Sequence, residues 1–231
     1  MLEAIFQEDT LWRVIGTEVI LESAQDDGVV RTLGIASALL ATYAFVPYVR
    51  DVLARRTEPQ NACWLIWSVL SSIALASQIA EGGTDSVWFS AIQVVGTLTV
   101  FLISLRHGGG PMMRAGDGLV LWAASLGLVL WAWTDNSVYA LIISISISML
   151  GGWVTIKKAY YYPGSETMST WVMSSVAAAL AILAIGSVDI VLMAYPLYLF
   201  TLYVLIVGAI TLGRARAARG IVPTVSPVKV T

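Results

Sequence analysis

Seven stretches without a charged side chain, each about 17 residues long or longer, occupy most of the sequence. They cover residues 33–49, 62–80, 86–105, 118–134, 136–156, 167–188 and 190–213. As helices rising about 1.5 Å per residue they span roughly 25 to 36 Å, and the hydrocarbon core of a bilayer is about 30 Å thick. Because they lack the period-two alternation of a membrane barrel, they predict an all-α integral membrane protein with seven transmembrane helices.

The composition agrees with lipid as the main solvent. Of the 231 residues, 58% are hydrophobic and 12% are charged, whereas about a quarter of the residues of a soluble domain are charged. The single cysteine, Cys63, cannot form a disulfide within the chain and indicates no redox compartment.

The basic residues fall almost entirely on one side of the predicted helices. Eleven of the thirteen lysines and arginines lie in the first, third and fifth connections or in the tail: Arg50, Arg55, Arg56, Arg106, Arg114, Lys157, Lys158, Arg214, Arg216, Arg219 and Lys229. The opposite connections carry acidic residues, namely Glu81, Asp85, Asp135 and Asp189. The positive-inside rule therefore predicts an N-terminus outside and a C-terminus in the cytoplasm.

A weak repeat relates the two halves of the chain. Trp171 follows Trp64 by 107 residues, and the pair Ser165-Glu166 follows Thr57-Glu58 by 108. We therefore predict a parallel duplication of the 3+1+3 type, in which a three-helix bundle at 31–110 is repeated at 137–213. Segment 111–136 between them, with its helix at 118–134, is the linker that keeps both triples in the same orientation.

The two ends of the chain are expected to lie outside the bundle. Residues 1–30 hold seven acidic side chains and no signal peptide pattern, and they predict either a helix on the outer membrane surface or a disordered acidic arm. Residues 214–231 form a basic, proline-punctuated tail that we expect to be attracted to anionic lipid in the cytoplasm.

The span at 62–80 has a polar face. Trp64, Trp67, Ser71 and Gln78 are spaced three, four and seven residues apart, so one side of the helix carries all four. The face is either a wall of a pathway for a polar solute, or a combination of interfacial tryptophans and side chains that hydrogen-bond to neighbouring helices.

A second amide lies at membrane depth in the next span. Gln93 precedes Gly96 and Thr97 by three and four residues, and an unpaired amide in hydrocarbon costs several kcal/mol. Gln93 must therefore have a partner, which is either protein or solute.

Several kinds of chemistry are absent from the sequence. His107 stands alone, no His or Cys cluster suggests a metal, and no charged residue lies deep in a predicted span. These features argue against ion-coupled pumping, and the missing lysine in the last span excludes a retinal protein. We expect no enzyme activity, no cofactor, no metal and no nucleic-acid partner.

Local motifs resemble one membrane family. Thr42-x-x-Phe45-x-Pro47 near the end of the first span, followed by a basic turn and Pro59-Gln60, resembles the SWEET, SemiSWEET and PQ-loop superfamily. Four further motifs look like a group of uncharacterised bacterial membrane proteins related to it: Trp64-Leu-Ile-Trp67, Lys158-Ala-Tyr160, Ser165-Glu166-Thr167 with Trp171, and Tyr195-Pro-Leu-Tyr198.

The resemblance implies facilitated diffusion by alternating access, with a pocket between the two triples. Pro47 takes the place of the family's hinge proline, and Gln93 with Gly96 stands about where the family has a pocket asparagine followed by glycine. The sequence departs from the pattern at Tyr48, where the family has glutamine, and at Val154-Thr155, where the second triple normally has a proline.

The sequence thus predicts a SWEET-like facilitative transporter of a small neutral, sugar-like solute in a bacterial inner membrane. The alternative is a non-transporting accessory subunit of a larger membrane assembly, and a homo-oligomer is compatible with either. The expected solute site comprises Trp67, Ser71, Gln78, Gln93, Ser174, Tyr198 and Tyr203, with Pro47 and Pro196 as hinges.

Overall fold

The computed structural model describes residues 27–83, 85, 87–107, 122, 129 and 137–220. All regular structure in these ranges is helical: α3 (Asp27–Leu53), α4 (Asn61–Ala80), α5 (Val87–His107), α7 (Ser137–Tyr161), the 3-10 helix η1 (Pro163–Ser165), α8 (Met168–Leu183) and α9 (Ile190–Ala218). Five of the helices are long and apolar enough to cross a membrane, and α8 is a shorter apolar helix. The prediction of a helical protein with membrane-length apolar segments is confirmed.

Some sequence predictions fall outside this range. The predicted linker helix at 118–134 is described only at Trp122 and Val129, which are both helical. The predicted acidic arm up to residue 26 and the tail from residue 221 also lie outside the described residues.

The ends of the helices do not coincide with the ends of the uncharged stretches, because capping residues determine where a helix begins and ends. Helix α8 ends at Leu183, before its apolar stretch does, and Gly186 beyond it has φ +69°, a left-handed conformation that favours glycine. Helix α9 begins after Asp189, whose carboxylate accepts hydrogen bonds from the backbone N–H groups of Val191 and Leu192 at 2.8 and 2.9 Å.

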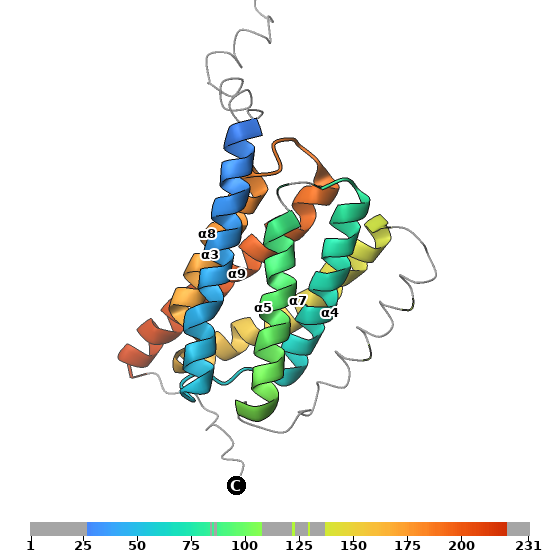
Figure 1. Cartoon of the computed structure of the whole chain (residues 1–231). Coiled ribbons are helices and arrows are strands. Elements are labelled where there is room, and N and C mark those ends of the chain that lie inside the picture. Colours follow the sequence, from blue (N-terminus) through green and yellow to red (C-terminus); the bar gives the residue numbers. More distant parts are fainter. Residues whose placement is uncertain are drawn as a thin grey trace, which may run out of the picture.

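The helices run in alternating directions that repeat between the two halves. In Figure 1, α3, α5, α7 and α9 run one way, while α4 and α8 run the other way. The end of the bundle where α3 and α7 finish is called the basic end here, after Arg50, Arg56, Lys157 and Lys158. The opposite end, with Glu81, Asp85 and Asp189, is called the acidic end.

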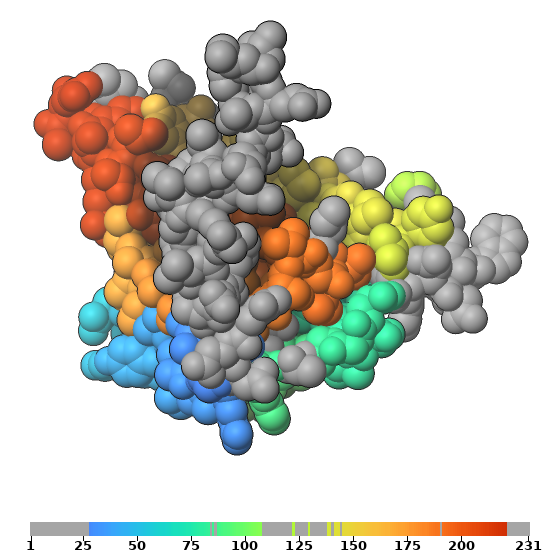
Figure 2. All heavy atoms as spheres, turned by 90° about the horizontal axis from the view of Figure 1, so that it is seen from above, coloured from blue at the N-terminus to red at the C-terminus, as the bar shows by residue number. Residues whose placement is uncertain are grey.

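The packing of the six helices follows the same repeat. Helix α5 packs against both α3 and α4, and α9 packs against both α7 and α8. The first triple (α3, α4, α5) meets the second triple (α7, α8, α9) mainly through the pairs α3–α8 and α4–α7. In the view along the bundle the two triples occupy opposite sides (Figure 2). The pattern stays the same when α3, α4 and α5 are exchanged for α7, α8 and α9, in that order. A parallel duplication would give this symmetry.

The outer surface of the bundle is apolar. Leu39, Val95, Ile142, Val176 and Leu212 lie on different helices and are all more than 45% exposed. Such a continuous apolar exterior suits contact with acyl chains, because lipid covers it without the free-energy cost that water would bring.

The contact between α7 and α9 depends on a glycine. A Cβ atom at Gly213 would lie 2.5 Å from the backbone oxygen of Tyr160 and 3.1 Å from that of Ala159. Gly208 on the same helix has nothing within 4 Å of its Cβ position. Small residues of this kind let membrane helices approach closely.

We therefore expect Gly213→Ala to destabilise the protein by about 1 to 3 kcal/mol, because the added methyl group meets backbone that cannot move without separating the helices. Gly208→Ala is the matched control and should hold or slightly raise stability, since alanine is the better helix former by about 1 kcal/mol. Thermal unfolding in detergent measures both. Equal effects of the two substitutions would show that the close contact at Gly213 is wrong.

Candidate functional site

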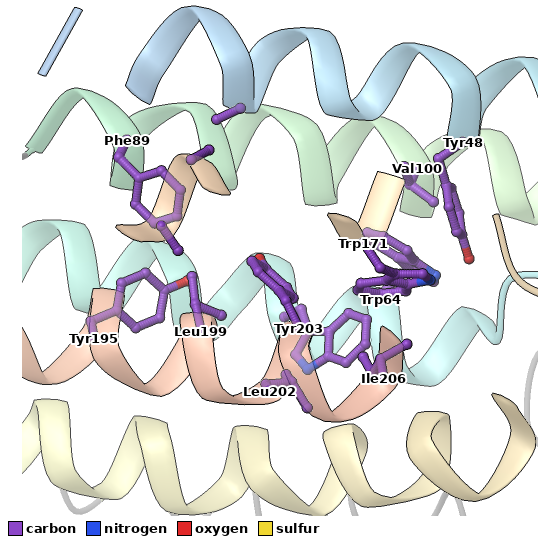
Figure 3. Packing of buried hydrophobic residues seen from close by; sticks show 14 of the residues in the cluster. Tyr48, Trp64, Phe89, Val100, Trp171, Tyr195, Leu199, Leu202, Tyr203 and Ile206 are labelled. Atoms are coloured by element: carbon purple, nitrogen blue, oxygen red, sulfur yellow. The ribbon is translucent and has the colours of Figure 1, made fainter. Parts of the chain in front are cut away.

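A cavity of about 30 Å³ lies between the two triples and receives side chains from all six α-helices. Its lining residues are Phe45, Trp64, Trp67, Gln93, Thr97, Ser148, Thr170, Trp171, Ser174, Tyr195, Leu199, Leu202 and Tyr203. Figure 3 shows several of these rings converging from α4, α8 and α9. Six of these thirteen residues are aromatic, five others carry a hydroxyl or amide group, two are leucines, and none is charged.

Four of the residues predicted for a solute site line this cavity. They are Trp67 of α4, Gln93 of α5, Ser174 of α8 and Tyr203 of α9. The predicted residues Ser71, Gln78 and Tyr198 are not among the lining residues. The structure thus brings together one predicted residue from each of α4, α5, α8 and α9.

Three polar groups of the lining are buried without a hydrogen-bond partner in the described part of the protein. They are Trp67 Nε1, Gln93 Nε2 and Thr170 Oγ1, and the residues are 8%, 2% and 3% exposed. Buried polar groups are nearly always paired, because an unpaired one costs about 1 to 3 kcal/mol. All three belong to residues that line the same cavity.

Gln93 has two roles, one for each atom of its amide. Its Oε1 accepts a hydrogen bond from the Tyr203 hydroxyl at 3.0 Å, which joins α5 to α9, while its Nε2 has no partner among the described residues. The Thr97 hydroxyl donates to the backbone oxygen of Gln93 at 2.6 Å. The amide oxygen is thus used in a contact between helices, whereas the amide nitrogen has no partner among the described residues.

Gly96 makes room for another wall of the cavity. A Cβ atom at this position would overlap the ring of Phe45 from α3. The glycine three residues after Gln93 thus lets an aromatic ring of α3 lie directly on α5, inside the first triple.

The other predicted side chains hold helices together. Gln78 Oε1 accepts from the Ser90 hydroxyl at 2.6 Å, and Ser71 lies 3.3 Å from the Thr97 hydroxyl, so both join α4 to α5. Tyr198 donates to Ser148 at 2.7 Å and joins α9 to α7.

The two predicted hinge prolines lie inside continuous helices. Pro47 lies within α3, which continues to Leu53, and Pro196 is buried within α9. Because proline lacks an N–H group, each removes one intrahelical hydrogen bond, so both positions are weak points in otherwise regular helices.

An aromatic cluster forms part of the cavity lining and extends through Tyr48 toward the basic end. It consists of Tyr48, Trp64, Trp67, Trp171 and Tyr203, with neighbouring ring centroids 4.9 to 6.4 Å apart. Trp64 and Trp171, which the repeat relates, both contact Tyr48 (Figure 3). Counterpart residues of the two triples therefore meet in one cluster.

A group of polar contacts, called here the interloop cluster, continues from the aromatic cluster to the basic end. The Thr167 hydroxyl donates to Asp51 Oδ2 at 2.9 Å and lies 2.8 Å from the Thr57 hydroxyl. Since the proton of Thr167 is directed to Asp51, Thr57 is the donor to Thr167. These bonds join the end of α3 and the connection between α3 and α4 to the start of α8, across the interface between the triples.

The second part of the interloop cluster is ionic. Lys158 Nζ pairs with Glu166 Oε1 at 3.0 Å and also donates to the backbone oxygen of Glu58. The other carboxylate oxygen of Glu166 accepts from Trp171 Nε1 at 3.2 Å. The Glu166 side chain is only 3% exposed, so the ion pair links the loop at the basic end to a ring that lines the cavity.

Sequence reasoning missed part of the lining. Thr170 and Ser148 were not predicted, although Thr170 directly precedes the repeat residue Trp171. Its position at the cavity follows from how α8 packs against α3 and α9, which the repeat by itself does not reveal.

No group of three or more potential metal ligands occurs in the ranges the structure describes. Comparison of the chain with protein-family models, with curated proteins and with solved structures finds no match in any of the three.

The Gln93–Tyr203 bond can be tested by a double-mutant cycle. Gln93→Leu and Tyr203→Phe should each lower stability, and the double variant should lose less than the sum, because each substitution removes the same bond. The expected coupling is about 0.6 kcal/mol, the average for hydrogen bonds between membrane helices. Denaturation in mixed micelles gives the four free energies, and strictly additive losses would exclude the bond.

Proposed function

We propose that the chain is a SWEET-like facilitative transporter that moves a small neutral polar solute by alternating access, without ion coupling. The observation that carries the proposal is the cavity between the triples, where Trp67, Gln93 and Thr170 hold buried polar groups that the described protein leaves unpaired. A transporter site needs such groups, because the solute must replace the hydrogen bonds that it loses on leaving water.

The proposed architecture has seven spans in a 3+1+3 parallel duplication, with residues 118–134 as the linker helix. The matching helix directions and the matching packing within both triples support this topology. The basic end is then cytoplasmic and the N-terminus outside, as the positive-inside rule favours. A bacterial cytoplasmic membrane is the proposed location.

The lining of the cavity favours a neutral solute. It has no charged side chain to balance an ion, and its unpaired groups include two N–H donors, those of Trp67 and Gln93. Aromatic rings from several helices offer flat apolar surfaces beside these donors. A solute with oxygen acceptors and an apolar face, such as a sugar-like molecule, suits this combination.

The small volume of the cavity supports a conformational change of the protein during transport. At about 30 Å³ it has room for little more than water, whereas small-molecule sites usually measure about 300 Å³ or more. In the proposed cycle the triples separate to admit the solute and close again around it.

The proposed inner gate consists of the aromatic cluster and the interloop cluster. Opening toward the basic end requires that Thr167 part from Thr57 and Asp51, and that Lys158 leave the backbone of Glu58. A neutral hydrogen bond contributes about 0.5 to 1.5 kcal/mol net and one to a charged group about 1.5 to 3 kcal/mol, so a few such bonds hold a gate closed while leaving the open state accessible. Pro47 directly precedes Tyr48 of the aromatic cluster and is the proposed hinge of the first triple.

Uptake into proteoliposomes tests the function directly. The wild-type protein should admit one member of a panel of sugars, amino acids and nucleosides without an ion gradient. Gln93→Leu and Thr170→Val should each slow this uptake roughly tenfold, as expected when a hydrogen bond worth about 1.4 kcal/mol is lost. Gln78→Leu removes the same kind of amide outside the cavity and should leave uptake near the wild-type level.

Two results would contradict the proposal. Equal losses from Gln93→Leu and Gln78→Leu would show that the cavity has no special role. A folded wild-type protein that takes up no member of the panel would favour the alternative of a non-transporting subunit in a membrane assembly.

The chain's only cysteine reports on the proposed gate. Cys63 is buried, and its Sγ lies near Gly151 of α7, so it is placed between the triples close to the basic end. Thr167→Val removes both hydrogen bonds of Thr167 and should raise the rate of Cys63 alkylation by a maleimide several-fold, because the open state becomes more populated. Thr211→Val, which removes a bond within α9 only, should leave the rate unchanged. Equal rates in both variants would exclude Thr167 from the gate.

A further inference from the structure

A second depression lies on the outer surface, where α3 ends and α8 begins. This groove, of about 650 Å³, is lined by Pro47, Arg50, Asp51, Leu53, Ala54, Arg56 and Ser169. It shares no lining residue with the central cavity, so it is a separate site.

The groove has a net positive charge. Arg50 and Arg56 contribute two positive charges and Asp51 one negative charge. Both oxygens of Asp51 already face donors, because Oδ1 lies 3.8 Å from Arg56 Nη1 and Oδ2 accepts from Thr167. Since the Arg56 side chain is 76% exposed, its remaining N–H groups can reach an anion in the groove.

The first turn of α8 adds to this charge. Thr167 is the N-cap residue, but its side chain makes no capping hydrogen bond and donates to Asp51 instead. The N–H groups of the first turn are thus left without a side-chain cap, and the exposed Ser169 lies in the same turn. The positive end of the helix dipole therefore supports the charge of the two arginines.

The groove lies at the depth where lipid headgroups are expected. It is at the basic end of membrane-length helices, and Leu53 and Val46 beside it on α3 are 49% and 44% exposed. We propose that this groove binds the phosphate of an anionic phospholipid, with Arg50, Arg56 and Ser169 as its donors and the acyl chains along α3. One phosphodiester charge balances the net charge of the three ionised side chains, and basic pockets between helices are typical sites for such headgroups.

The repeat offers an internal comparison. At the offset of 107 residues, Arg50 corresponds to Lys157, Arg56 to Pro163, and Ser169 to Ala62. Lys157 lies over the ring of Trp153, 5.3 Å from its centroid. The counterpart position between α7 and α4 therefore lacks two of the three donors, and we infer one such lipid site in each chain.

The test uses the purified full chain in a neutral detergent. Phosphatidylglycerol, phosphatidylcholine and inorganic phosphate are added separately, and thermal unfolding and native mass spectrometry are measured. Phosphatidylglycerol should raise the melting temperature and leave one lipid bound, and the other two should have little effect. Arg50→Gln with Arg56→Gln should remove most of the shift and the bound lipid. The matched pair Lys157→Gln with Arg219→Gln removes two charges outside the groove and should retain both.

A single substitution tests the same site independently, in case the variant with both arginines replaced does not fold. Ser169→Asp places a negative charge in the first turn of α8, where it suits the helix dipole, so the protein should stay folded while phosphatidylglycerol binding is lost. Equal losses in the two paired variants would overturn the proposal, because they would indicate a general charge effect. Equal stabilisation by phosphatidylcholine would also overturn it, and equal stabilisation by inorganic phosphate would indicate a site for free anions.

Discussion

The rest of the structure depends on one constraint, that polar groups surrounded by lipid and apolar side chains must find partners inside the protein. Several of the buried polar side chains meet this need with hydrogen bonds that join helices. Ser37 donates to the backbone oxygen of Ala177 at 2.7 Å across α3 and α8, and Ser90 with Gln78 does the same for α5 and α4. Buried polar groups without a partner among the described residues also occur elsewhere, as at Gln78 Nε2, but three of them belong to residues that line the same cavity.

The two triples have the same arrangement of helices, but equivalent positions carry side chains of different charge. At the repeat offset Asp51 corresponds to Lys158, and each takes part in the interloop cluster with the opposite charge. Packing needs only comparable shapes at equivalent positions, whereas hydrogen bonds and ion pairs need complementary atoms. Two halves with the same contacts between helices can therefore carry different charged and hydrogen-bonding groups at the basic end.

The sequence predicted the helices well because an uncharged stretch of membrane length has few alternatives to a helix. It was less informative about helix ends, since α8 stops at a left-handed glycine turn inside its apolar stretch. For the site, Gln93 was recognisable because an amide at membrane depth demands a partner. The separation of Gln93 from Gln78 was not predictable, because both are buried amides and only the packing decides which one meets the cavity.

Asp51 belongs both to the groove on the outer surface and to the interloop cluster. An anion that draws Arg56 away from this carboxylate leaves Asp51 more strongly dependent on Thr167. Thermodynamic linkage then requires reciprocity: if the lipid favours the closed arrangement, closure raises the affinity for the lipid by the same factor. In the proposed transport cycle, the lipid composition at the basic end would then set, through this one carboxylate, the balance between the open and closed states of the proposed gate.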